Sequence, residues 1–195
     1  MRAVLLFIVL SVFVFACNKS AENQYEESIK AHRKEITKIF LIKESSPLED
    51  EDRTYFVGLN YFPIDQSYAV WASYRALPPQ LSTMNTTGER TADCLKAATL
   101  DFELLGKRIQ LLAYRSTNPE DECLFLPFGD LTNGESSYDA GRYIDLEEPD
   151  SNMLLLDFNK SYNPYCAYSD KWSCVIPPPE NRLDLKIEAG EMKFH

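Results

Sequence analysis

The segment from Met153 to Leu183 constrains the fold more than any other part of this 195-residue chain. It holds two cysteines, four prolines and three asparagines among many aromatic residues, so it is too irregular for a helix and too interrupted for a strand. A long loop in a compact domain must find partners for its backbone polar groups, and such loops often form functional sites. We therefore expect a rigid loop, held by its own side chains, that carries the recognition surface.

The start of the chain has the pattern of a secretory signal peptide. Arg2 precedes an apolar run from Ala3 to Ala16 that is too short to span a bilayer and stops at Cys17. Residues 14–17 read Val-Phe-Ala-Cys and resemble the lipobox of bacterial lipoproteins, in which the cysteine is lipidated and becomes the first mature residue. Phe15 departs from this pattern, because a small residue is usual there.

These features predict three regions: a signal peptide at 1–16, a lipidated tether at 17–23 and a single β-rich domain at 24–195. The protein would be exported and attached through Cys17 to a membrane of the bacterial cell envelope. The alternative is a plain signal peptide cut near Ala16, which would leave a free thiol at residue 17.

The acidic composition limits the partners. The formal net charge is −10 at pH 7, and loss of Arg2 with the signal peptide would make it −11. A surface of this charge repels phosphate and gains nothing from counterion release, so we expect no nucleic-acid partner. The acidic runs Glu49–Asp52 and Asp145–Asp150 lack EF-hand spacing and are expected to be solvated loops.

One substantial helix is expected near the start of the domain. From Tyr25 to about Ile42, apolar residues recur at helical spacing, as in an amphipathic helix packed on a core. His32 falls on the same stripe and is expected at the edge of the core. Ser46 precedes Pro47, which disfavours helical backbone and ends the helix.

The rest of the chain predicts short antiparallel strands. Gly88 and Gly106 mark turns, and Pro78 with Pro79 is expected to end the first strand. The connections are too short for parallel crossovers. We predict a mainly β (α+β) fold, an antiparallel β-barrel or sandwich with one N-terminal amphipathic helix. Eight or nine strands are expected, at 67–75, 81–87, 90–96, 99–105, 108–115, 123–128, 141–146, 153–158 and 183–188.

Several motifs resemble a bacterial family catalogued as domain of unknown function 1684, over nearly all of the mature chain. They include Gly58–Pro63 (GLNYFP), Leu124–Thr132 (LFLPFGDLT), Tyr162–Pro164 (YNP) and Glu180–Leu183 (ENRL). Val175 departs from the family pattern, where a proline is expected. The resemblance implies a single domain and a candidate surface, and it implies no established reaction.

The loop cysteines favour a disulfide. Cys166 and Cys174 lie eight residues apart, and an exported chain meets an oxidising compartment. Such a bond would contribute about 2–3 kcal/mol in the chain-entropy model. Cys94 and Cys123 are a second candidate pair, provided that their Cα atoms lie within about 7 Å.

Two other roles for the loop thiols are weaker. A zinc site would need Glu180 or Glu191 as a further ligand, and zinc prefers tight Cys-x-x-Cys knuckles or histidines, so we expect no metal and no cofactor. A thiol nucleophile would need a base, and the sequence offers only His32 and His195.

The candidate site combines polar and aromatic residues. Arg142 is expected to bind either Asp157 or a ligand carboxylate. Asp157 ends an apolar run and is expected either to cap loop amides or to form an acid pair with Glu180 or Glu191. Tyr162 and Trp172 would add aromatic walls. The candidate ligand-binding residues are Arg142, Tyr143, Asp157, Asn159, Asn163, Tyr168, Glu180 and Asn181.

Two functions remain open at this stage. The first is a binding or envelope-interaction module that takes an unknown small molecule or envelope component and leaves it unchanged. The second is a hydrolase that uses Asp157 with Glu180 or Glu191 as acid and base, which requires a carboxyl pair within about 10 Å on an open cleft. The chain lacks the usual sequence motifs of serine hydrolases, phosphate-binding loops, dinucleotide folds and zinc proteases.

Overall fold

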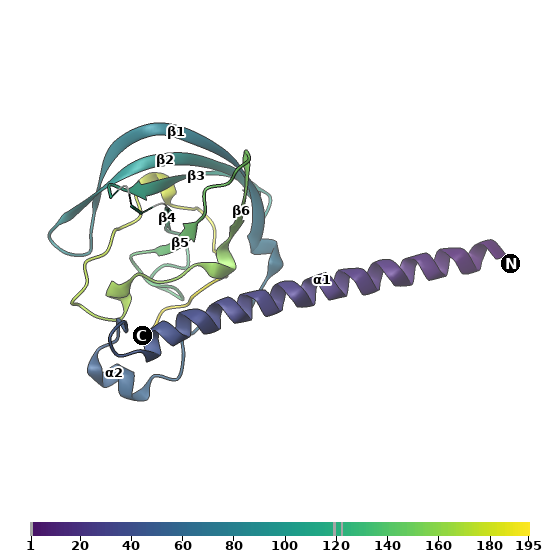
Figure 1. Cartoon of the computed structure of the whole chain (residues 1–195), viewed down its shortest axis with the longest axis horizontal. Coiled ribbons are helices and arrows are strands. Elements are labelled where there is room, and N and C mark those ends of the chain that lie inside the picture. The colour runs from purple at the N-terminus through teal and green to yellow at the C-terminus, as the bar shows by residue number, and fades with distance from the viewer. Residues whose placement is uncertain (1, 119, 122) are drawn as a thin grey trace.

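The computed structural model describes the backbone of residues 2–118, 120–121 and 123–195, with side chains from residue 21 onward. A strongly curled sheet forms a half-barrel, and a long N-terminal helix packs beside it (Figure 1). The helices are α1 (Arg2–Leu41) and α2 (Asp50–Tyr55), with one-turn 3-10 helices η1 (Gln66–Tyr68), η2 (Phe158–Lys160), η3 (Tyr165–Ala167) and η4 (Pro179–Asn181). The strands are β1 (Ala69–Asn85), β2 (Thr91–Leu104), β3 (Lys107–Ser116), β4 (Leu124–Phe128), β5 (Arg142–Leu146) and β6 (Met153–Asp157).

The sheet is antiparallel throughout, with the strand order β5-β4-β3-β2-β1-β6. Five strands follow one another as a meander, and β6 then pairs with the free side of β1 from Ala69↔Asp157 to Ser73↔Met153. At the β2–β3 hairpin, Leu105 and Gly106 both have positive φ, 51° and 76°, as a two-residue turn requires. The predicted mainly β fold with an N-terminal helix is confirmed.

The predicted number of strands is wrong, because two pairs of predicted strands are each one strand. Those expected at 90–96 and 99–105 form β2, and those expected at 67–75 and 81–87 form β1, which continues through Pro78 and Pro79. A register shift between Ala76 and Gln80 accommodates the prolines as a bulge. β6 pairs with β1 only as far as Ser73. The prolines lie beyond that point, where one edge of β1 has no partner strand, so the N–H that proline lacks is not needed for a sheet hydrogen bond.

The strand predicted at 183–188 is also absent, although its alternation is real. Leu183, Leu185 and Ile187 are buried, and the residues between them face outward. Side chains bond backbone groups that a partner strand would otherwise use. The Asp130 carboxylate accepts the Ile187 N–H at 3.2 Å, and Arg142 donates to the Ile187 carbonyl at 2.8 Å. This C-terminal segment therefore closes the open side of the half-barrel without joining the sheet.

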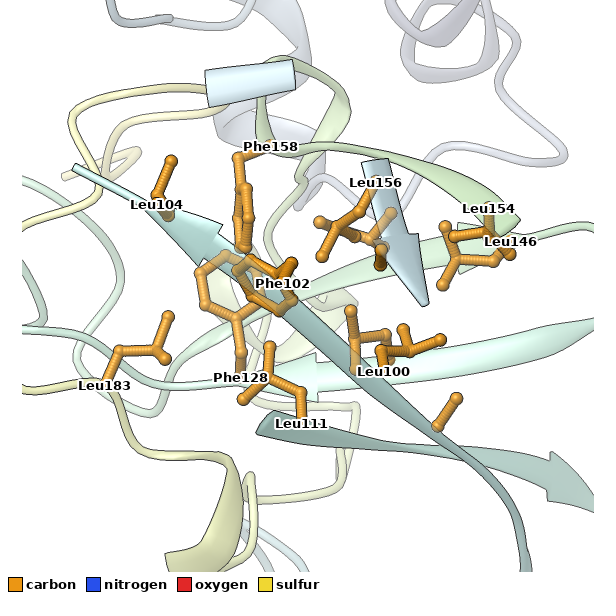
Figure 2. Close-up of a cluster of buried hydrophobic side chains, with 14 of the residues drawn as sticks. Leu100, Phe102, Leu104, Leu111, Phe128, Leu146, Leu154, Leu156, Phe158 and Leu183 are labelled. Atoms are coloured by element: carbon orange, nitrogen blue, oxygen red, sulfur yellow. The ribbon is translucent and has the colours of Figure 1, made fainter. Parts of the chain in front are cut away.

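The main core fills the concave side of the sheet (Figure 2). Phe128 and Phe158 meet edge to face with their ring centroids 5.2 Å apart, and Phe102 packs on Phe158 at 6.0 Å. Leu100 and Leu111, from the paired strands β2 and β3, are shielded from solvent in the same cluster. The core thus fixes the end of β6, from which the irregular loop that runs to Leu183 departs.

The C-terminal half of α1 is held by a second, smaller cluster. Phe40, Leu48 and Tyr168 form this cluster, and Phe40 packs edge to face on Tyr168 with a centroid distance of 4.8 Å. Ile29, nearer the middle of α1, is fully buried as well. The predicted amphipathic helix is confirmed, and it continues upstream as far as Arg2. The expected signal peptide, the tether up to residue 20 and Cys17 lie outside the residues whose side chains are described. Across the described residues, no helix has both the length and the apolar character to cross a bilayer.

The acidic run Glu49–Asp52, predicted to be a loop, forms the start of α2. Asp50, Glu51 and Asp52 occupy the first turn of that helix, where negative charge complements the partial positive charge of the helix N-terminus. The second acidic run begins inside β5 at Asp145.

Candidate functional site

An aromatic pocket of about 420 Å³ lies between the last turns of α1, the edge of the sheet at β4 and β5, and the loop after η2. Ile36, Ile39 and Phe40 line it from α1. Seven of the side chains around it are aromatic, and most of its surface is apolar. We refer to this site as the aromatic pocket.

Two backbone hydrogen bonds place the loop against β5. The Tyr143 N–H donates to the Tyr162 carbonyl at 2.9 Å, and the Tyr162 N–H donates to the Tyr143 carbonyl at 3.0 Å. Their rings meet edge to face with centroids 5.9 Å apart and form one wall. Upstream, the Asp157 carboxylate caps η2 by accepting the Asn159 N–H at 3.0 Å, which turns the chain out of β6.

Glu191 forms the base of the aromatic pocket and is only 1% exposed. Its carboxylate accepts the Asn163 backbone N–H and the Asn163 side-chain amide, both at 3.0 Å, and the Tyr168 hydroxyl. Burial raises the pKa of Glu191 to about 7, against the lowering effect of these donors and of Arg142. This carboxyl group therefore exchanges its proton near neutral pH.

Asn163 has one unused acceptor at the pocket. Its Nδ2 donates to Glu191 and, at 2.8 Å, to the Met192 carbonyl, which fixes the orientation of the amide. Its Oδ1 is buried and has no hydrogen-bond partner among the described residues. A buried acceptor without a partner costs about 1–3 kcal/mol.

Asp145 supplies a second carboxylate at the open side of the pocket. Both of its oxygens lie 2.9 Å from the Tyr162 hydroxyl, which donates to them. Asp145 is exposed as a whole residue, but neighbouring side chains partly desolvate its carboxylate and so raise its pKa, while the Tyr162 hydrogen bond opposes that rise.

The formal charges around the pocket are all negative. Among the described residues that line it, Asp145 and Glu191 are carboxylates and none is lysine, arginine or histidine. A carboxylate or phosphate ligand would meet repulsion without a compensating cation. A neutral or positively charged ligand would instead meet aromatic faces and carboxylate oxygens, which both attract cations.

Arg142 does not pair with Asp157, and that prediction is wrong. It is fully buried, with its Nη2 2.8 Å from Asp130 Oδ2. The same guanidinium donates to the backbone carbonyls of Ile187, Ala189 and Glu191 at 2.8, 2.5 and 3.2 Å. Burial lowers the pKa of Arg142, and the Asp130 charge opposes this. Arg142 therefore holds the C-terminal segment on the sheet.

Asp157 and Asn159 lie against α1. Both Asp157 oxygens accept from the Tyr25 hydroxyl, at 3.0 and 3.1 Å, and the Asn159 amide donates to that hydroxyl at 2.9 Å. Asn159 also bridges to the backbone of Asp65. The capping alternative for Asp157 is confirmed, and both residues act as the attachment point of α1.

Glu180 and Asn181 lie elsewhere as well. The buried Asn181 amide bonds both backbone groups of Leu112 at 2.8 Å and so fastens η4 to β3. Glu180 is exposed, lies 3.5 Å from Lys96 and lines a separate groove with the prolines before it. The three carboxylates of the predicted hydrolase therefore lie apart from one another: Asp157 lies against α1, Glu180 lines the separate groove and Glu191 lines the aromatic pocket.

Of the predicted site residues, Tyr143, Asn163, Tyr168 and Glu191 do meet at one pocket, together with the expected walls Tyr162 and Trp172. Sequence reasoning did not assign the other lining residues to the site, which are Ile36, Ile39, Phe40, Phe125, Asp145, Pro164, Tyr165 and Cys174. One signal was available, because Asp145 stands between the buried residues Ile144 and Leu146 and must face the other side of β5.

The predicted disulfides are not present in this structure. Cys166 and Cys174 are neighbouring free thiols, with the Cys166 N–H donating to Cys174 Sγ at 3.2 Å. Cys94 lies on β2, whereas Cys123 precedes β4, so β3 stands between them and their separation exceeds the span of a disulfide. Within the described part of the chain, no cluster of three or more metal-ligating side chains occurs.

Comparison with known proteins identifies the family. The family described as "Protein of unknown function (DUF1684)" matches residues 54–192. The solution NMR structure of an uncharacterised protein from gene locus rrnAC0354 of Haloarcula marismortui is 38% identical, with a TM-score of 0.71 over 89% of this chain and 96% of that one. Among curated proteins, none matches. The chain belongs to the DUF1684 family.

Proposed function

We propose that this domain is a binding module whose aromatic pocket takes a small ligand with an apolar or aromatic body and a neutral or positively charged hydrogen-bond donor. The observation that carries this proposal is the lining of the pocket: seven aromatic side chains, two carboxylates and, among the described residues, no cation. Its volume of about 420 Å³ suits a small molecule.

The polar groups suggest how such a ligand would be oriented. Asp145 at the open side would attract a cation before it enters. A cation over an aromatic face contributes about 0.5–2 kcal/mol, with more at desolvated sites. Binding of this kind needs no chemical change in the ligand.

Three probes of one shape test the proposal: 2-phenylethylamine, 2-phenylethanol and phenylacetate, titrated by calorimetry into the full-length protein in detergent. They share the aromatic ring and differ in the charge of the polar end. We expect the amine and the alcohol to bind and phenylacetate to bind at least about tenfold more weakly. Equal or tighter binding of phenylacetate, or no binding of any probe, would overturn the proposal.

A pair of variants on α1 locates the binding. Ile39 lines the pocket, and Leu41 on the same helix is 60% exposed and does not line it. Ile39→Trp should fill the pocket and abolish amine binding, whereas Leu41→Trp should leave it unchanged. Asp145→Asn should reduce affinity for the amine more than for the alcohol.

We also propose that the domain is attached to a membrane of the cell envelope by a lipid on Cys17. The support is in the sequence, where the apolar run Ala3–Ala16 leads directly to this cysteine. A lipidated chain would keep the binding domain near the membrane surface. Its pocket would then meet small molecules or envelope components outside the cytoplasm.

Metabolic labelling with an alkyne fatty acid tests the anchor. Labelling and membrane fractionation should both be lost in Cys17→Ser and retained in Cys123→Ser, because Cys123 is exposed but lies within the domain. Unchanged labelling of Cys17→Ser would contradict the lipid anchor and would leave the pocket proposal untouched.

A further inference from the structure

Cys166 and Cys174 form a thiol pair that the proposed binding function does not use. Cys174 lines the aromatic pocket, whereas Cys166 lines a separate polar groove of about 830 Å³. The two residues are in direct contact, because the Cys166 N–H donates to Cys174 Sγ at 3.2 Å. Each of the two cavities therefore has one thiol of the pair in its lining.

The position of Cys174 is fixed by the turn between β1 and β2. The Cys174 N–H donates to Thr87 Oγ1 at 3.1 Å, and the Thr87 N–H donates to the Cys174 carbonyl at 2.9 Å. Cys166 lies on η3, whose carbonyl at this residue accepts from the Tyr138 hydroxyl at 3.5 Å. Both sulfurs are thus held close together by contacts outside their own loop.

The surroundings of the Cys166 sulfur favour its ionised form. The Tyr138 hydroxyl lies 3.5 Å away and can donate to it, and the Cys174 and Thr87 side chains lower its pKa. The bond from Cys174 is the largest cause that lowers the pKa of Cys166 to about 6, and the same bond raises the pKa of Cys174.

Charged groups of both signs share the groove with Cys166. Glu89 and Arg90 come from the β1–β2 turn, and Asp170 and Lys171 come from the loop itself. Their formal charges cancel, so the groove admits a small molecule that carries both carboxylates and ammonium groups. No histidine among the described residues lines it.

We propose that Cys166 and Cys174 are a thiol–disulfide exchange site, with Cys166 as the attacking thiolate and Cys174 as the resolving thiol. The Cys166 thiolate attacks one sulfur of a small-molecule disulfide, forms a mixed disulfide and releases the first thiolate. Cys174 then loses its proton to solvent, attacks Cys166 Sγ, forms the Cys166–Cys174 bond and releases the second thiolate. The two protein thiols are oxidised while one external disulfide is reduced, so atoms and electrons balance.

Oxidised glutathione is the probe, incubated with the full-length protein in detergent without oxygen and followed by peptide mass spectrometry. The wild type should form the Cys166–Cys174 disulfide. Cys174→Ser should stop at a glutathione adduct on Cys166, because the resolving thiol is gone. Cys166→Ser should leave Cys174 at least about tenfold less reactive. Absence of both the disulfide in the wild type and the adduct in Cys174→Ser would overturn the proposal.

Alkylation by iodoacetamide tests the proposal on the wild-type protein, so a variant that fails to fold cannot affect the result. Half-maximal reactivity of Cys166 should fall near pH 6. Cys94 is the internal control, because burial raises its pKa to about 11 and it should stay unreacted at pH 7. Cys166 reacting no faster than Cys94 at pH 7 would refute its role as the attacking thiolate.

Discussion

The guanidinium of Arg142 lies 2.8 Å from the carboxylate of Asp130, and both side chains are completely shielded from solvent. Asp130 follows β4 and Arg142 begins β5, so the pair spans the loop between two neighbouring strands. The other Arg142 hydrogen bonds go to carbonyls of the C-terminal segment. One buried ion pair therefore connects the sheet to the segment that closes it.

Replacing Arg142 with methionine should lower the free energy of unfolding by about 3–5 kcal/mol, because the buried Asp130 charge and three carbonyls lose their partner. Urea denaturation would show this as a lower midpoint at constant slope. Lys96→Met is the matched control, since the Lys96–Glu180 pair is partly exposed at 3.5 Å and such pairs contribute about 0–1 kcal/mol. Equal losses in both variants would contradict the structural role of Arg142.

Stability should depend on pH through Glu191. Its pKa is raised from 4.5 to about 7 on folding, so the folded protein holds the proton more tightly. The stabilisation by the protonated group is complete below pH 4.5 and is lost as the pH rises through about 7. This loss corresponds to about 3 kcal/mol.

The measurement compares the wild type with Glu191→Gln across that range. The free energy of unfolding of the glutamine variant, relative to that of the wild type, should rise by about 3 kcal/mol as the pH increases from 4.5 to 7. Above pH 7 this difference should stay constant. Glu135→Gln, which alters an exposed ion pair with Lys186, should show no such trend. A constant difference between Glu191→Gln and the wild type would show that Glu191 titrates normally.

Gly190 and Gly106 have nearly the same φ, so alanine substitutions at the two positions distinguish steric crowding from backbone strain. Gly190 has φ +77° and Gly106 has φ +76°, but a Cβ on Gly190 would lie 1.9 Å from Ser161 Oγ and 2.6 Å from the Phe158 carbonyl. A Cβ on Gly106 would meet nothing within 4 Å. Gly106→Ala should cost about 1–2 kcal/mol from the left-handed backbone alone. Gly190→Ala should cost at least about 2 kcal/mol more in thermal or urea unfolding, and similar costs would contradict this packing.

The hydroxyl of Tyr25 should determine how firmly α1 is attached. Tyr25→Phe removes the donor to Asp157 and the acceptor for Asn159, and hydrogen bonds to a charged group contribute about 1.5–3 kcal/mol. Hydrogen exchange of α1 amides should accelerate in this variant while the β2–β3 amides stay protected. Tyr55→Phe, at an 82% exposed tyrosine, is the control and should change neither region.

Much of the fold could be read from periodicity. The spacing of Ile29, Ile36 and Phe40 predicts α1, and the turn at Gly106 follows from the need for positive φ. The prolines of β1 misled the prediction, because their tolerance depends on how far β6 extends along the neighbouring edge. Such pairing between distant segments is not visible in local sequence.

The candidate site was predicted less completely. Tyr162 and Tyr168 were found because aromatic residues accumulate in the loop, whereas Arg142 and Asn181 were assigned to ligand binding although they bond backbone groups. A polar residue that satisfies a carbonyl looks the same in sequence as one that faces a ligand. Distinguishing them requires burial and partners, which only the folded structure provides.

The carbonyl partners of Arg142 have a consequence for the order of biosynthesis. They belong to residues 187–191, whereas the strands that carry Arg142 and its neighbours are complete by residue 157. A chain that emerges from its N-terminus onward therefore exposes the concave face of its sheet, with the guanidinium only half partnered, until that late segment arrives. Closure of the half-barrel therefore cannot be completed before residues 187–191 have been synthesised.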